Sequence, residues 1–153
     1  MLGFVEPKAG EVFYDLGCGS GQPLMIAALA FPQLAACKGI ELLESLASLG
    51  KEANSKLERL SHEQNVPCAP ISVIHGDIFK DDWSDADIIF VASVCFSAEL
   101  MEMFSDACSR LKKGTRILFM NTLPTGRPYL KEVASWRGYF TWGLHMTKFY
   151  MTI

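Results

Sequence analysis

Three glycines and a carboxylate in the segment DLGCGSGQ (15–22) are the first residues of this 153-residue sequence whose spacing could do chemistry. The glycines alternate with other residues at Gly17, Gly19 and Gly21. A dinucleotide-binding fingerprint would have glycine in place of Gln22, and a phosphate-binding P-loop would end in Gly-Lys-Ser/Thr. Asp15, just before the glycines, suits a ligand with an ammonium group better than a pyrophosphate. The alternative is a tight strand-to-helix turn that needs glycine for positive φ.

Two further carboxylates follow segments that have the composition of strands. Glu41 lies twenty residues after Gly21, at the end of the second expected strand, where a carboxylate can accept both hydroxyls of a ribose. Asp77, in HGDIF, ends the third expected strand and can accept a hydrogen bond from an exocyclic amine such as that of adenine. Taken singly, Glu41 could be a solvated charge and Asp77 a helix N-cap. Three carboxylates at adjacent strand ends form a much more specific pattern.

The elements that would position these residues follow from apolar runs that alternate with helical patterns. Strands are expected at 11–17, 37–42, 71–78, 86–93 and 115–121, and helices at 20–31, at 43–60 and from a Ser97 N-cap to near Gly114. Residues 139–144 and 147–153 are expected to pair as an antiparallel hairpin at the sheet's edge, whereas 129–136 is ambiguous. Residues 80–85, with Asp81, Asp82 and Asp85, are expected to form a solvated acidic turn. This alternation predicts an α/β sandwich with a mostly parallel sheet, whose ligands bind at the carboxyl ends of its strands.

The composition limits the class of protein further. The length predicts a single domain, residues 1–153, and the net charge of −3 provides no basic field for strong direct nucleic-acid binding. The apolar runs are too short to span a bilayer, and the N-terminus lacks a signal-peptide pattern. The five cysteines form no C-x-x-C pair, and the three histidines are scattered, so we expect reduced thiols and no metal site. We therefore expect an intracellular protein, cytoplasmic or nuclear, without membrane association.

The segments DLGCGSGQ, GIEL, GDIF and ADIIFVASVCF together resemble the Rossmann-like class I S-adenosylmethionine-dependent methyltransferases, over nearly the whole chain. The resemblance implies a seven-stranded, mostly parallel sheet with an antiparallel last strand and helices on both faces. It also implies S-adenosylmethionine as cofactor and S-adenosylhomocysteine as product. In such a site the glycines and Gln22 lie along the methionine part, Asp15 lies near its amino end and Glu41 takes the ribose hydroxyls. Leu42 would pack on the adenine, and Asp77 with Ile78 would read its edge.

A narrower resemblance is carried by EVFYDLGCGSGQ, by GDIFKDDW, by the helix after FVASVCF and by SW-x-G…FYMTI. These segments look like the non-SET histone lysine methyltransferases, the disruptor-of-telomeric-silencing family. That family has an aromatic channel for the target lysine, and the matching residues are Phe96, Trp136 and Phe149, with Trp142 as a further candidate. The family also has paired asparagines after the fourth strand. Because this chain has Ala92 and Ser93 there, the polar group near the accepting amine is missing or is replaced by the Ser93 hydroxyl.

The expected reaction is transfer of a methyl group to the lysine of a protein substrate, with a histone as one such protein. Because positioning supplies much of the acceleration of such a displacement, no strong acid–base pair is required. The family's N-terminal cap over the cofactor has no counterpart before the first strand, so we expect a partner or a second subunit to complete the active site. The alternatives are a small-molecule or other protein acceptor, and a cofactor-binding but inactive module that acts with a partner.

Overall fold

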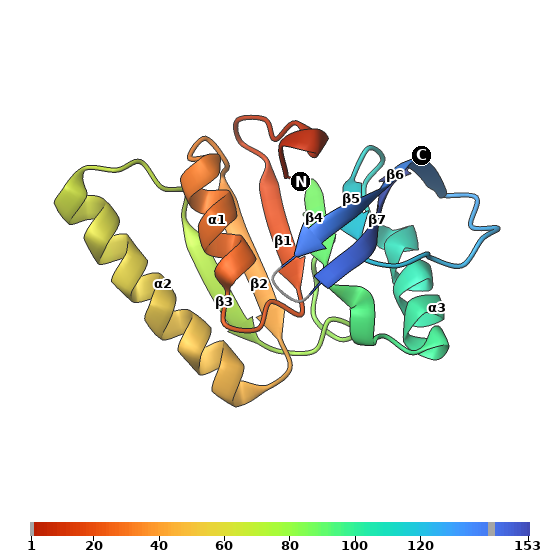
Figure 1. Ribbon diagram of the computed structural model, residues 1–153, viewed down its shortest axis with the longest axis horizontal. Coiled ribbons are helices and arrows are strands. Elements are labelled where there is room, and N and C mark those ends of the chain that lie inside the picture. Colours follow the sequence, from red (N-terminus) through yellow and green to blue (C-terminus); the bar gives the residue numbers. More distant parts are fainter. Residues whose placement is uncertain (1, 141–142) are drawn as a thin grey trace.

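The computed structural model describes residues 2–140 and 143–153 and contains one seven-stranded sheet (Figure 1). The strand order is β3-β2-β1-β4-β5-β7-β6. The strands are β1 (Val12–Leu16), β2 (Ala36–Glu41), β3 (Ile71–His75), β4 (Ile88–Val91), β5 (Arg116–Phe119), β6 (Leu130–Phe140) and β7 (Gly143–Thr152). The first five strands pair in parallel, and β7 runs antiparallel to both of its neighbours. The predicted sheet, with its antiparallel last strand, is therefore confirmed.

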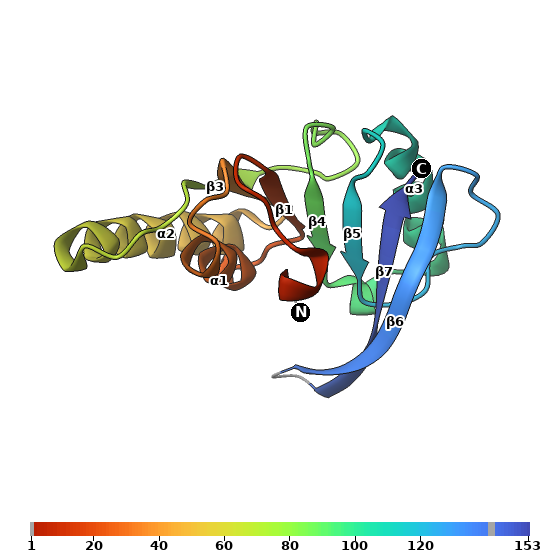
Figure 2. The same ribbon diagram turned by 90° about the horizontal axis from the view of Figure 1, so that it is seen from above.

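Helices cover both faces of this sheet, as the two views in Figures 1 and 2 show. Helices α1 (Gln22–Ala30) and α2 (Glu44–Gln64) lie on one face, where Leu24 and Ala28 pack in one apolar cluster with Phe13. Helix α3 (Ala98–Ala107) lies on the other face, where Phe104 packs in a second cluster with Trp83. Strand β4 separates the two clusters, and all four of its residues are buried. We call these two sides the α1 face and the α3 face.

Capping residues mark the start of α3 and the end of α2. The Oγ of Ser97 accepts a hydrogen bond from the N–H of Leu100 at 3.2 Å, so the predicted N-cap of α3 is confirmed. Helix α2 extends beyond the expected 43–60 to Gln64, and its C-cap, Asn65, takes a left-handed conformation with φ 53°. The last turn, SHEQ, carries no apolar residue, so hydrophobic periodicity gave no signal for it.

The C-terminal hairpin is also longer than expected. Strand β6 begins at Leu130 and includes the segment that was ambiguous in sequence, with a register shift between Glu132 and Ala134. An edge strand that is interrupted by a bulge loses the simple alternation of apolar and polar residues. Because Phe119 at the end of β5 pairs with Lys148, the tip of the hairpin extends past the carboxyl end of β5 (Figure 2).

The acidic turn at 80–85 is not simply solvated, which corrects the expectation from the sequence. Asp85 accepts hydrogen bonds from the Tyr14 hydroxyl at 2.8 Å and from Lys38 at 2.6 Å. Asp81 accepts one from the backbone N–H of Asp77 at 2.6 Å. The partners of Asp85 come from distant strands, and the partner of Asp81 comes from a local backbone turn. A run of acidic residues in the sequence predicts neither kind of partner.

Each of the five cysteines, all within the described residues, carries a free thiol; Cys95 is exposed, and Cys18, Cys37 and Cys108 are buried. Among the described residues, no helix combines the length and the apolar character that crossing a bilayer requires.

Candidate functional site

The glycine loop joins the end of β1 to the start of α1. Gly17, Gly19 and Gly21 have φ values of 82°, 56° and 82°, in the left-handed region that favours glycine. The N–H groups of Gly17 and Cys18 donate to the carbonyl of Ile40 at 2.8 and 3.2 Å, which ties the loop to β2. A Cβ atom on Gly17 or Gly19 would meet nothing within 4 Å, so the outer side of the loop is open to a ligand.

Asp15 lies beneath this loop as a buried, unpaired carboxylate. Its side chain is 1% exposed, and neither oxygen has a hydrogen-bond partner among the described residues. It lines a cavity of about 230 Å³ together with the glycine loop, the start of α1 and the end of β4. Burial, and the nearby charge of Glu41, raise the pKa of Asp15 to about 8. A buried carboxylate is costly without a compensating partner, so this cavity suits a ligand that brings a cation.

Glu41 connects the glycine loop to the segment that follows β2. Its Oε2 accepts a hydrogen bond from the N–H of Gly19 at 2.8 Å, and its Oε1 accepts one from the N–H of Leu43 at 2.9 Å. A carboxylate oxygen has two lone pairs, so each oxygen retains a position for a hydroxyl donor. The neighbouring Leu42 is 64% exposed and presents an uncovered apolar side chain.

Asp77 and Ile78 follow the next strand along the sheet. The N–H of Gly76 donates to the carbonyl of Glu41 at 2.9 Å, so the end of β3 lies beside the end of β2. Oδ1 of Asp77 accepts from the N–H of Phe79 at 3.0 Å, and Oδ2 faces Lys80 Nζ at 3.2 Å. This backbone hydrogen bond, aided by the lysine, holds the pKa of Asp77 below its usual value. Asp77 therefore caps a turn rather than a helix, and the structure brings it to the same sheet edge as Glu41.

The predicted substrate-side residues fall into separate groups. Ser93 is fully buried, and its hydroxyl donates to the carbonyl of Met120 at 2.8 Å. Phe96 packs edge-on against Phe119 in the α3-face cluster, with ring centroids 6.2 Å apart. Trp136 packs instead on the α1 face, so the structure does not bring it into one cluster with Phe96.

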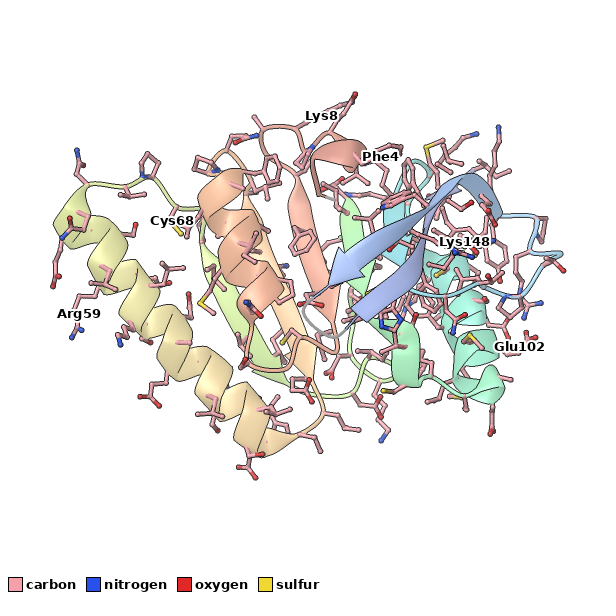
Figure 3. All side chains as sticks on the ribbon, in the orientation of Figure 1. Phe4, Lys8, Arg59, Cys68, Glu102 and Lys148 are labelled. Atoms are coloured by element: carbon pink, nitrogen blue, oxygen red, sulfur yellow. The ribbon has the colours of Figure 1, made fainter. Side chains whose placement is uncertain are left out.

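Trp136 and Phe149 meet around an aromatic residue that sequence reasoning missed. The Phe4 ring centroid lies 4.7 Å from that of Trp136 and 6.2 Å from that of Phe149. Phe4 reaches the hairpin from the N-terminal segment (Figure 3). It helps to line a hollow of about 430 Å³. An isolated aromatic residue near the N-terminus has no spacing that could have singled it out. Trp142 lies outside the described residues.

A larger hollow, of about 590 Å³, lies between the end of α2 and the segment 65–70, near the Cys68 labelled in Figure 3. It contains none of the predicted site residues. The smaller cavity beneath the glycine loop is the better candidate site, because it holds the unpaired carboxylate.

Comparison with known proteins agrees with this geometry. Residues 1–135 match the family described as histone methylation protein DOT1. A protein-lysine N-methyltransferase of Saccharolobus islandicus (strain REY15A) is 26% identical over 119 residues, which cover 77% of this chain and 66% of that protein. The chain thus spans just under two thirds of the length of this curated relative.

Two solved structures share the fold. The tRNA methyltransferase TrmK of B. subtilis aligns with a TM-score of 0.72 at 15% identity, over 99% of this chain and 65% of that one. TrmN from Thermus thermophilus aligns with a TM-score of 0.74 at 15% identity, over 99% of this chain and 47% of that one. At such identities the likeness shows the class I methyltransferase fold alone.

Proposed function

Because this chain belongs to the DOT1 family of histone methylation proteins, we propose that it binds S-adenosylmethionine and transfers its methyl group to the side-chain amine of a protein lysine. The observation that carries the proposal is the unpaired carboxylate of Asp15 beneath an open glycine loop, with Glu41 at the adjacent strand end. The relative described as a protein-lysine N-methyltransferase supports the choice of acceptor.

The residues at the sheet edge fit the three parts of this cofactor. Asp15 would pair with the ammonium group, which would favour its ionised form in spite of the burial. Glu41 would accept the ribose hydroxyls through its remaining lone pairs. Leu42 would cover one face of the adenine, and Asp77 with Ile78 would face its edge. Gln22, exposed at the first position of α1, would lie beside the methionine part.

When bound, the cofactor supplies an electrophilic methyl group on a sulfonium. The chain's own task is to hold an uncharged amine in line with it, since only the neutral amine has a lone pair to donate. The aromatic group of Phe4, Trp136 and Phe149 supports this role, because apolar faces can hold the alkyl stem of a lysine in place. The hairpin that carries Trp136 and Phe149 extends past the carboxyl end of β5, on the sheet edge where the glycine loop lies.

One observation favours a second candidate, a cofactor-binding module that is inactive alone and acts with a partner. Ser93, the residue expected to replace the family's asparagines, is fully buried, and its hydroxyl hydrogen is already donated to Met120. An acceptor amine cannot reach a hydroxyl that is enclosed in this way.

Calorimetry with S-adenosylhomocysteine, followed by transfer of labelled methyl groups to histones and mixed protein extracts, tests the proposal. The wild-type chain is expected to bind, and to yield labelled methyl-lysine in extracts that supply the partner expected to complete the active site. Gly19→Arg should abolish binding, because the position has φ 56° and opens on the ligand side of the loop. Gly126→Arg is the matched control, since Gly126 also has positive φ (84°) and open space but lies outside the loop.

Absence of binding by the wild-type chain, or equal binding by Gly19→Arg, contradicts the proposal. Binding without any labelled lysine supports the second candidate instead.

A further inference from the structure

We propose that Asp81, Trp83 and Arg110 form a bracket that holds residues 76–79 in the conformation that selects a 6-aminopurine over a 6-oxopurine. We call these three side chains the adenine bracket. The inference rests on the proposed function and deepens it, because it assigns positioning residues to one end of the proposed cofactor site.

Asp81 fixes the backbone at the start of the segment. Its Oδ2 accepts a hydrogen bond from the N–H of Asp77 at 2.6 Å, and its own N–H donates to the carbonyl of Asp77 at 2.8 Å. The carboxylate fits directly against Gly76, where a Cβ atom would lie 2.1 Å from Oδ2. The absence of a side chain at Gly76 therefore makes room for Asp81. A charged acceptor on a backbone N–H gives a shorter and stronger hydrogen bond than a neutral one.

Trp83 and Arg110 fix the next peptide unit from the α3 face. The indole N–H of Trp83 donates to the carbonyl of Ile78 at 2.7 Å, and the indole is fully buried and stacked on Phe104. The guanidinium of Arg110 lies over the Trp83 ring at 4.4 Å and donates to the carbonyl of Asp81 at 3.2 Å. It also reaches the carbonyl of Ile78 at 3.4 Å. The Trp83 ring thus positions Arg110, whose guanidinium links the carbonyls of Ile78 and Asp81.

These contacts decide which groups of the segment face a ligand. Within the described part of the chain, the N–H of Ile78 has no hydrogen-bond partner, whereas the carbonyl of Ile78 has two. The carboxylate of the preceding residue, Asp77, accepts from the N–H of Phe79 and faces Lys80 Nζ, and each of its oxygens keeps a free lone pair. Adenine offers an acceptor, N1, next to a donor, its 6-amino group. Hypoxanthine offers a donor, N1–H, next to an acceptor, O6, so the same pair of protein groups would reject it.

The experiment compares two ligands by calorimetry: S-adenosylhomocysteine and its deaminated analogue, S-inosylhomocysteine. The wild-type chain is expected to prefer the first. Asp81→Ala should weaken binding of S-adenosylhomocysteine by about 5- to 10-fold, the range of a lost hydrogen bond, and leave the analogue within about twofold. Trp83→Phe keeps a stacked ring but loses the N–H donor, and should act in the same direction. The preference should therefore collapse in both variants, which a purely structural role would not produce.

Asp82→Ala is the matched control, because the neighbouring carboxylate accepts from the N–H of Ser84 at 2.9 Å and, among the described residues, makes no hydrogen bond to residues 76–79. If Asp81→Ala fails to fold, Trp83→Phe carries the test alone. A wild-type chain that binds neither ligand would refute the proposed function. A chain that binds both equally, or variants that lose both ligands in equal proportion, would refute the bracket and leave the proposed function standing.

Discussion

Asp15 is a carboxyl group enclosed by protein atoms, without a hydrogen-bond partner among the described residues. Its pKa of about 8, against an ordinary 3.8, means that the folded chain holds a proton that the unfolded chain releases between these pH values. Because the folded pKa is the higher of the two, the contribution of Asp15 to stability is complete below about pH 4 and is lost as the pH rises through about pH 8.

Asp15→Asn tests this dependence, because the amide has a similar shape and stays neutral. The free energy of unfolding of the wild-type chain, minus that of the variant, should fall steadily from about pH 5 to about pH 8. Urea unfolding at several pH values in this window measures the difference. A constant difference would contradict the raised pKa. A slope that disappears when S-adenosylhomocysteine is present would show that the ligand's ammonium keeps Asp15 ionised.

Glu41 is the second carboxylate whose role can be measured. It holds the N–H groups of Gly19 and Leu43 and is proposed to accept the ribose hydroxyls as well. Glu41→Ala should weaken binding of S-adenosylhomocysteine by about 1–3 kcal/mol, the size expected when a charged hydrogen-bond partner is lost. Calorimetry with Glu52→Ala, which removes an exposed carboxylate from the middle of α2, controls for the change in net charge. Equal affinities in the two variants would contradict binding of the ribose by Glu41. Its role would then be limited to the hydrogen bonds with Gly19 and Leu43.

At the scale of elements, the glycine loop depends on how closely β2 approaches α1. Gly39 faces this contact, and a Cβ atom there would lie 2.5 Å from Leu24 Cδ1 and 2.6 Å from Cys18 Sγ. Leu24 is fully buried and Cys18 belongs to the loop itself, so neither neighbour can move without disturbing the site. The strand, the loop and the helix therefore form one packed unit.

Gly39→Ala should destabilise the fold by about 1–3 kcal/mol, as overpacking of a dense core does. Because Cys18 is one of the displaced neighbours, the variant should also bind S-adenosylhomocysteine less tightly. Gly3→Ala is the control, since a Cβ atom there meets nothing within 4 Å and the position has no positive φ. Urea unfolding of the two variants checks the expectation, which a stable Gly39→Ala chain would contradict.

Elements with a regular pattern could be predicted from the sequence. The residues of β4 are apolar because both of its faces are buried, and α3 has a serine whose hydroxyl caps it. Strand β6 could not be predicted over its full length, because it lies at the sheet edge and contains a bulge. Its placement depends on pairing with β7, and a local segment does not encode that pairing.

The candidate site divides in the same way. Asp15 and Glu41 could be predicted, because each ends a recognisable strand and the topology brings parallel strand ends to one edge. The position of Phe4 against Trp136 could not, since the two residues are far apart in sequence and meet only in the folded chain. The sequence predicts Asp81 as a solvated charge, because its partner is a backbone N–H and such contacts leave no mark in composition.

At the scale of the whole molecule, the proposed cofactor site belongs to the ends of β1, β2 and β3 in a single sheet. One apolar cluster covers each face of that sheet, and the central strands contribute to both. Trp83 lies in the α3-face cluster and Trp136 packs on the α1 face, so tryptophan fluorescence reports on both sides. A ligand that joins three strand ends should therefore stabilise both sides together.

S-adenosylhomocysteine is expected to shift the unfolding of the whole chain as one transition. At a free concentration of about 100 times Kd, a ligand that binds only the folded state adds about 2.7 kcal/mol to the free energy of unfolding. Tryptophan fluorescence and far-ultraviolet circular dichroism should show the same shift of the urea midpoint, because a single cooperative domain unfolds in one step. Gly19→Arg should show no shift, and Gly126→Arg should shift as the wild-type chain does. Two separate transitions, with only one displaced by the ligand, would mean that the α3 face unfolds independently of the cofactor site.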